Sequence, residues 1–315
     1  MKMLTINVAP HVFTPVDTRY MVRGVIKALI PATCASLYFF RWQAFLVIIA
    51  SIAGCVLTEY AIQKFRKKQI TLGDSSAVLT GLLLALVLPP VLPLWMAFLG
   101  GVFAIAFGKE IFGGIGCNIF NPALLARAFL MATFPVALTT WSQPITLDAV
   151  TTATPLGLIK FGGAATPYMS LFLGNVGGCI GETSAIALLL GMGYLLYTKI
   201  IDYRVPLAYI ATVAVFAFIT HAINPKLFPG TPLFHILAGG LLIGAIFMAT
   251  DPVTSPVTAK GRWIFGIGCG LITMIIRIWG GLPEGVMYSI LCMNALAPLI
   301  NRVTKPKRYG ETREK

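Results

Sequence analysis

The chain has 315 residues, of which 57% are hydrophobic and only 11% are charged. A soluble domain carries about 25% charged and about 45–50% apolar residues, so the composition excludes an ordinary soluble protein. The formal net charge is +13. Because the basic residues lie between long apolar runs and not on one polar face, the charge points to a lipid bilayer and away from nucleic acid.

The N-terminal segment, residues 1–21, has no apolar core and no small-residue cleavage site, which predicts that it is retained in the cytoplasm. Ten apolar segments follow that approach the ~20 residues needed to cross a bilayer. They are residues 22–41, 44–62, 76–89, 93–112, 121–137, 182–198, 205–222, 233–250, 262–279 and 285–301. The third ends at Pro89-Pro90, and the fifth begins at Asn121-Pro122, which favours a helix start. We therefore expect an all-α integral membrane protein of about ten transmembrane helices.

The basic residues predict the orientation of these spans. With the N-terminus inside, 19 of the 24 Lys and Arg residues fall on the cytoplasmic side, including the tail 302–315. Four fall outside (Arg41, Lys160, Lys226 and Arg277), and Arg127 falls within a span. This asymmetry follows the positive-inside rule, so both termini are expected in the cytoplasm.

The longest connection, residues 138–181, is outside the cytoplasm in this topology. It has no long apolar stretch and is rich in Gly, Thr and Pro. A connection of this length between packed spans is more often functional than idle. The predicted organisation is therefore a first five-helix repeat (22–137), the extracytoplasmic loop (138–181), a second five-helix repeat (182–301) and a basic tail (302–315).

An internal repeat supports this division. TGLLLALVLPPVLP and FGGIGCNIFNPALLARAF in the first half correspond in order to GGLLIGAIFMATDPVTSP and WGGLPEGVMYSILCMNALAP in the second. Since five spans is an odd number, the two copies enter the membrane from opposite sides, as in inverted-repeat transporters whose broken helices form a site near the midplane. Chance similarity between Gly- and Leu-rich helices is the alternative.

The extracytoplasmic loop contains the sequence Asp148-Ala149-Val150-Thr151-Thr152-Ala153-Thr154. Small neighbours leave a threonine hydroxyl accessible, and Asp148 is close enough in sequence to orient it. A solvated loop with local side-chain to backbone hydrogen bonds is the simpler interpretation of the spacing alone.

This segment resembles the flavinylation motif D-x-x-[S/T]-x-A-T of the membrane subunits of Rnf and Na⁺-pumping NADH:quinone oxidoreductase complexes. Thr154 matches the threonine to which a flavin transferase attaches FMN through its phosphate, with Asp148, Thr151 and Ala153 as the flanking motif; Thr152 replaces the usual glycine. Further blocks resemble the NqrB/RnfD family, and within it the D subunits of Rnf (Rsx) complexes. These blocks are Asn118-x-Phe120-Asn121-Pro122-Ala123, Gly174-Asn175 through Ser184, and Ala249 through Pro256.

The resemblance implies a urea-transporter-like fold of two inverted repeats in the bacterial or archaeal cytoplasmic membrane. It also implies covalent FMN, a second non-covalent flavin such as riboflavin, and partners in the Rnf subunits A, B, C, E and G. The complex would couple ferredoxin:NAD⁺ electron transfer to Na⁺ or H⁺ translocation. Alone the chain is expected to be catalytically incomplete, since nothing in it resembles a nicotinamide site.

Ionisable residues inside spans are rarely left facing lipid, because a charge at the bilayer centre costs about 2.5–3.5 kcal/mol. Arg127 is therefore a candidate cation beside a flavin or a partner charge. Asn121 at the entry of the same span and Glu182 at the start of the sixth are further candidate flavin-binding residues. Glu110, Asp251 and Arg277 lie near span ends, where snorkelling to the interface explains them.

The six cysteines are scattered without a C-x-x-C pair, which favours free buried thiols over a metal site within this chain. A cysteine shared with a neighbouring subunit's iron–sulfur cluster stays open. His221 and His235 have no further ligands at metal spacing. The two rivals to a flavoprotein subunit are a small-solute channel of urea-transporter-like architecture and a structural membrane scaffold.

Overall fold

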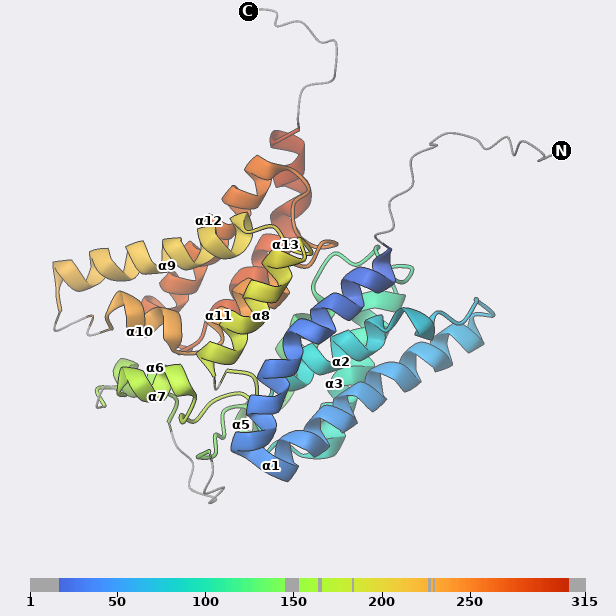
Figure 1. Ribbon diagram of the computed structural model, residues 1–315, viewed down its shortest axis with the longest axis horizontal. Coiled ribbons are helices and arrows are strands. Elements are labelled where there is room, and N and C mark those ends of the chain that lie inside the picture. Colours follow the sequence, from blue (N-terminus) through green and yellow to red (C-terminus); the bar gives the residue numbers. More distant parts are fainter. Residues whose placement is uncertain are drawn as a thin grey trace, which may run out of the picture.

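The computed structural model describes residues 17–144, 153–163, 166–182, 184–225, 228 and 230–305, and these ranges contain helices and turns but no strand. Figure 1 shows the helices gathered into one body. The N-terminal end of α1 and the C-terminal end of α13 point to its upper edge, and the short helices α6 and α7 lie at the lower side. The structure is thus all-helical over the residues that it describes.

Helix α1 (Thr18–Phe65) is a helical hairpin. Arg41 breaks it with φ 48° and ψ −127°, a backbone conformation outside the helical region. The two arms turn back on each other at this point, the dark and lighter blue rods of Figure 1. The two apolar segments predicted at 22–41 and 44–62 are therefore confirmed as separate helices, joined without a loop.

The rest of the first half consists of short helices that pack on this hairpin. They are η1 (Leu72–Asp74), α2 (Ser76–Leu86), α3 (Leu94–Ile105), the π-helix η2 (Ala106–Glu110), α4 (Pro122–Thr133) and α5 (Pro135–Leu138). Helix α2 ends just before Pro89-Pro90, and α4 begins at Pro122 after an Asn121 cap whose Oδ1 accepts from the N–H groups of Ala123 and Leu124. Both ends lie where the prolines predicted them.

Small residues allow α1 to approach its neighbours closely. A Cβ on Gly81 of α2 would lie 2.7 Å from the Cα of Ile52, and one on Gly101 of α3 would lie 2.6 Å from the backbone oxygen of Ser51. Glycine at these positions lets helices pack with their backbones almost in contact, as is common between membrane helices. The hairpin α1 is thereby fixed against α2 and α3.

The connection predicted as a loop contains two short helices, α6 (Pro155–Lys160) and α7 (Tyr168–Leu173). Leu156 and Leu171 from these helices join Phe234 and Ala238 in a small apolar cluster separate from the main core. This part of the loop is therefore packed on the second half of the chain.

The second half contains α8 (Ala185–Tyr197), α9 (Arg204–Ile223), α10 (Pro232–Leu237), α11 (Leu241–Ile243), the π-helix η3 (Gly244–Met248), α12 (Ala259–Trp279) and α13 (Val286–Val303). The span predicted at 233–250 is wrong as a continuous helix, since it is three pieces. The break follows α10, where Gly239 has φ +73°, a conformation that favours glycine.

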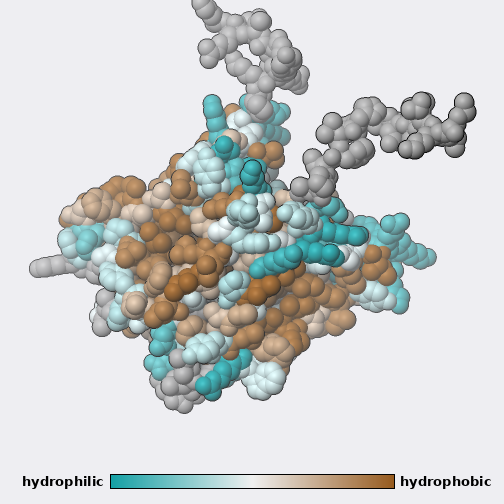
Figure 2. Space-filling view, viewed as in Figure 1, coloured by the Kyte–Doolittle hydropathy of each residue, from teal (hydrophilic) through white to brown (hydrophobic). Residues whose placement is uncertain are grey.

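Four helices of the described residues are long and apolar enough to cross a membrane: α1, α9, α12 and α13. In Figure 2 hydrophobic side chains spread over the middle of the visible face, while hydrophilic ones lie toward its upper, right and lower edges. This distribution fits an integral membrane protein. The inverted-repeat arrangement and the domain boundaries stay predictions.

Candidate flavin sites

Thr154 is the N-cap of α6. Its Oγ1 accepts a hydrogen bond from the N–H of Gly157 at 3.2 Å, Pro155 occupies the first helical position, and the side chain is buried. A Cβ on Gly157 would lie 3.2 Å from the same Oγ1, so glycine leaves room around the hydroxyl. The sequence Thr-Pro-x-Gly thus fixes the position of this hydroxyl group.

A cavity of about 370 Å³, which we call the tether cavity, opens beside Thr154. Its walls include the predicted site residues Ala153 and Arg127, together with Glu284 and the rings of Trp141, Phe161 and Tyr288. Ligand pockets are typically apolar and aromatic with a few convergent polar groups. The tether cavity has that composition. The motif residues Asp148 and Thr151 lie outside the described residues.

Arg127 points from α4 toward the second half of the chain and is 6% exposed. Its Nη2 donates to Glu284 Oε2 at 3.0 Å and to Cys179 Sγ at 3.2 Å. Glu284 stands in the turn before α13, with a side chain that is 17% exposed. Of the two alternatives expected for Arg127, a flavin or a partner charge beside it, the structure shows the partner charge, and the sequence did not identify Glu284 as that partner.

Glu182 lies next to this ion pair. Its Oε2 accepts from the N–H of Cys179 at 3.2 Å, and it lines a smaller pocket with Thr154 and Glu284. The segment before it is bound to the end of α2, where Ile180 N–H donates to Leu88 O at 3.0 Å and Gly181 N–H to Leu86 O at 2.6 Å. The tether cavity is therefore anchored to both halves of the chain.

Lys160 fixes the other end of α6. Its Nζ donates to the backbone oxygens of Ile276, Gly280 and Leu282. These hydrogen bonds hold the turn that leads to Glu284. Partial burial lowers the pKa of Lys160, because the charged ammonium loses solvation. Lys160 thus links α6 to this turn and helps to determine where α6 lies relative to the Arg127–Glu284 ion pair.

Arg277 and Glu110 are buried, at 4% and 2% exposure, so the snorkelling prediction is wrong for both. Arg277 donates to His235 O at 2.6 Å and to Ala238 O at 3.2 Å, the carbonyls at the end of α10. A guanidinium satisfies these carbonyls because the helix break leaves them without helical partners. Arg277 thus stabilises the break at Gly239.

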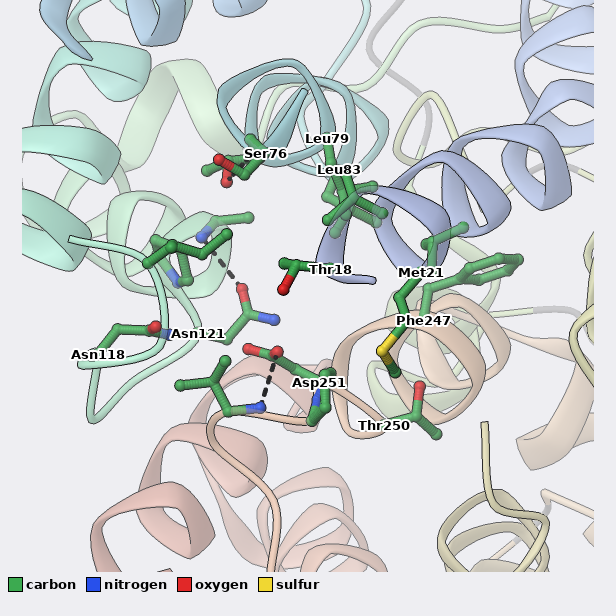
Figure 3. Close-up of a pocket in the computed structure, with 18 of the residues that line it drawn as sticks. Thr18, Met21, Ser76, Leu79, Leu83, Asn118, Asn121, Phe247, Thr250 and Asp251 are labelled. Atoms are coloured by element: carbon green, nitrogen blue, oxygen red, sulfur yellow. Dashed lines mark hydrogen bonds between the residues drawn. The ribbon is translucent and has the colours of Figure 1, made fainter. Parts of the chain in front are cut away.

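Asn121 lies elsewhere, in a pocket of about 160 Å³ that also receives Asp251, Asn118 and the apolar side chains of Met21 and Phe247. Figure 3 shows the side chains of Asn121 and Asp251 directed toward each other across this pocket, which we call the Asn-Asp pocket. Asp251 accepts from the Val253 N–H and the Thr254 hydroxyl, each at 3.2 Å. The predicted site residues are therefore divided between two pockets.

Lys109, which lines the Asn-Asp pocket, belongs to a buried ion pair. Lys109 donates to Glu59 Oε1 at 2.7 Å and to the hydroxyl of Ser76, at the start of α2, at 2.6 Å. Gln63 Nε2 donates to the same glutamate at 3.1 Å. The sequence alone does not single out this pair, because its members lie 50 residues apart and on different helices.

Comparison with known proteins shows the family of this chain. The NQR2, RnfD, RnfE family model matches residues 5–310. The chain belongs to this family. The D subunit of the Na⁺-translocating ferredoxin:NAD⁺ oxidoreductase complex of Acetobacterium woodii is 48% identical, with 99% of this chain and 97% of that protein covered.

Two more relatives illustrate the range of sequence identity within the family. The D subunit of the proton-translocating ferredoxin:NAD⁺ oxidoreductase complex of Clostridium ljungdahlii is 47% identical over 98% of this chain and 97% of its own length. The D subunit of an ion-translocating oxidoreductase complex of Escherichia coli (strain K12 / DH10B) is 33% identical over 96% of this chain and 97% of its own length. The names of the Acetobacterium and Clostridium proteins specify different ions, so family membership leaves the coupling ion open.

Proposed function

We propose that this chain is the D subunit of an Rnf-type complex and relays electrons through FMN attached covalently to Thr154. The observation that carries the proposal is the position of this hydroxyl, capped on α6 at the wall of a 370 Å³ cavity with aromatic sides and a buried arginine. A flavin held there supplies one- and two-electron redox chemistry.

The chain's own residues fit such a group. Arg127 Nε and Glu284 Oε1 are buried without a hydrogen-bond partner among the described residues, and both side chains line the tether cavity. Unpaired buried polar atoms are costly, so their presence at a cavity wall favours a bound ligand with donors and acceptors of its own. The roles of these residues are to orient the ring, to exclude water and to provide a fixed charge.

We assign the second, non-covalent flavin to the Asn-Asp pocket. Its walls are mostly apolar, while the amides of Asn118 and Asn121 and the carboxylate of Asp251 provide polar groups for the edge of a riboflavin-type ring. Asp251→Ala is expected to lower the flavin that acid extracts from the purified chain, and to leave the covalent flavin in place. Equal amounts of extractable flavin in both proteins would contradict the assignment.

The proposed topology has both termini in the cytoplasm and Thr154 on the opposite face, in a bacterial or archaeal cytoplasmic membrane. Support comes from the positive-inside charge distribution and from the position of α6 across the body from the start of α1 and the end of α13 (Figure 1). Electron transfer from ferredoxin to NAD⁺, with Na⁺ or H⁺ translocation, would then need the Rnf subunits A, B, C, E and G. A flavin transferase would be needed during maturation.

In-gel fluorescence tests the proposal. The chain, expressed with its flavin transferase, should give a fluorescent band on a denaturing gel and the mass increase of FMN. Thr154→Asn should give a dark band, because asparagine keeps the N-cap acceptor but has no hydroxyl to form the phosphoester. A dark, unmodified wild-type chain would defeat the flavoprotein proposal, and solute flux by that chain in liposomes would support a transporter.

A further inference from the structure

Unpartnered polar atoms concentrate around the tether cavity. Among the described residues, ten buried side-chain nitrogen or oxygen atoms have no hydrogen-bond partner. Four of them belong to the two arginines and two glutamates of this region: Arg127 Nε, Arg277 Nε, Glu182 Oε1 and Glu284 Oε1. A set of charges that is only partly paired responds strongly to another charge placed beside it, since little water is present to screen it.

The backbone brings three of these four side chains, those of Arg277, Glu284 and Glu182, together at Gly239 and Gly240. A Cβ on Gly239 would lie 3.2 Å from Arg277 Nη2 and 3.7 Å from Glu284 Oε1. A Cβ on Gly240 would lie 2.7 Å from Glu182 Oε1. The two glycines therefore leave space that the charged groups occupy, and the helix break after α10 is what makes the cluster possible.

Arg127 and Arg277 have different roles in this cluster. Arg277 directs its hydrogen bonds to backbone carbonyls, and it is not among the residues that line the tether cavity. Arg127 lines that cavity together with Thr154, and its Nη2 is held by Glu284 and Cys179. Of the two arginines in the cluster, Arg127 is thus the one that lines the cavity beside Thr154.

We propose that the Arg127–Glu284 ion pair sets the midpoint potential of the flavin at Thr154, an inference that rests on the proposed function. The positive charge of Arg127 favours the electron-rich reduced ring over the oxidised one. Glu284 opposes this effect by neutralising Arg127. Arg127 and Glu284 are positioning residues that act by charge, and neither needs to bond to the reacting atoms.

The cluster has one competing interpretation. Cys179 Sγ and a carboxylate oxygen of Glu182 and of Glu284 all lie within 4.8 Å of one another, a spacing that can hold a metal ion. The guanidinium of Arg127 already contacts the sulfur at 3.2 Å and Glu284 at 3.0 Å. Because this fixed cation would repel a metal ion at the same ligands, the geometry favours the ion pair.

A redox titration of the full-length, flavinylated chain tests the proposal. The absorbance of the covalent flavin is followed against potential in wild type and in four variants of it. Glu284→Gln keeps an acceptor for Arg127 but removes the negative charge, so the midpoint potential should rise. Arg127→Gln should lower it, and Arg127→Lys should fall between Arg127→Gln and wild type. Asp202→Asn removes one negative charge at a remote turn and should leave the potential unchanged.

The outcomes separate this inference from the proposed function. A fluorescent band with the same midpoint potential in Glu284→Gln, Arg127→Gln and wild type overturns the proposed effect of the ion pair on the potential and leaves the covalent flavin intact. A dark wild-type band overturns both. One zinc or iron ion per purified chain, lost in Cys179→Ser, also overturns the proposal, because a metal would then hold the position given to the ion pair. Since Glu284→Gln is isosteric, a rise in its potential supports the proposal even where Arg127→Gln does not fold.

Discussion

Arg127 of α4 and Glu284 before α13 are 157 residues apart in the chain and form a 3.0 Å ion pair. The pair joins the two halves of the molecule in a place where both charges have lost most of their water. Removing one member of such a pair is more harmful than removing both, because the remaining charge stays buried without compensation.

Glu284→Gln and Arg127→Met, alone and combined, measure this coupling. Arg127→Met should destabilise the chain by about 3 kcal/mol, the order expected when one partner of a buried pair is lost. The double variant should lose less than the sum of the single ones. Unfolding in detergent provides the measurement, and additive losses would mean that the two charges act independently.

Close packing of α1 on α3 gives a second prediction. Gly101→Ala should destabilise the chain by about 1–3 kcal/mol, since its Cβ would lie 2.6 Å from Ser51 O and 2.9 Å from Cys55 N. Gly193→Ala in α8 is the matched control, because no atom lies within 4 Å of its added Cβ. The control should be neutral or slightly stabilising from the higher helix propensity of alanine. Equal unfolding temperatures for both variants would contradict the packing argument.

Asp202, in the turn between α8 and α9, is expected to make the stability of the fold depend on pH. Burial raises the pKa of Asp202, but hydrogen bonds from Arg204 N–H and from Arg262 Nη1, together with both positive charges, outweigh it and lower the pKa below its ordinary value. Asp202 therefore stabilises the fold at neutral pH, and this contribution is lost as pH falls from the ordinary aspartate range through the lowered pKa.

Asp202→Asn measures that contribution. The arginine side chains are 32% exposed, so the difference in unfolding free energy at pH 7 should be below about 1 kcal/mol. It should shrink as the pH falls from the ordinary aspartate range through the lowered pKa, because Asp202 is protonated first in the unfolded and then in the folded wild-type chain. A difference in unfolding free energy that grows on acidification would show that the pKa of Asp202 is not lowered in the folded chain.

Topology gives the fourth prediction. In a chain without its native cysteines, Phe161→Cys after α6 should react with a membrane-impermeant maleimide in intact cells. Lys68→Cys, in the turn after α1, should react only after lysis. Both positions are exposed, so access to the thiol depends on the side of the membrane and not on burial. Labelling of both from the same side would refute the ten-span orientation.

Most of the helix positions were predictable because long apolar runs, prolines and caps act locally. Asn121-Pro122 and Pro89-Pro90 mark helix ends through the geometry of single residues. The break after α10 was missed because residues 233–250 are almost uniformly apolar, and a Gly-Gly pair within such a run is also found in continuous membrane helices. Its cause is tertiary, since Arg277 satisfies the carbonyls that the break exposes.

The candidate site was predictable only in part. Thr154 stood out through a local motif, and Arg127 through the cost of a charge within an apolar run. Glu284 did not stand out, because an acidic residue in a turn between spans is ordinary in sequence. Its role depends on a partner from the other half of the chain, and a single sequence contains no record of that pairing.

Helix α2 connects the two pockets. Its first residue, Ser76, lines the Asn-Asp pocket and accepts from Lys109, and its last turn leads into the Leu86 and Leu88 carbonyls that bind Gly181 and Ile180. Eleven residues at about 1.5 Å each give a rod of roughly 16 Å. A tilt of this rod at one end would displace the segment that carries Cys179 and Glu182 at the other. A ligand that tilted α2 at one candidate flavin site would therefore move residues at the other.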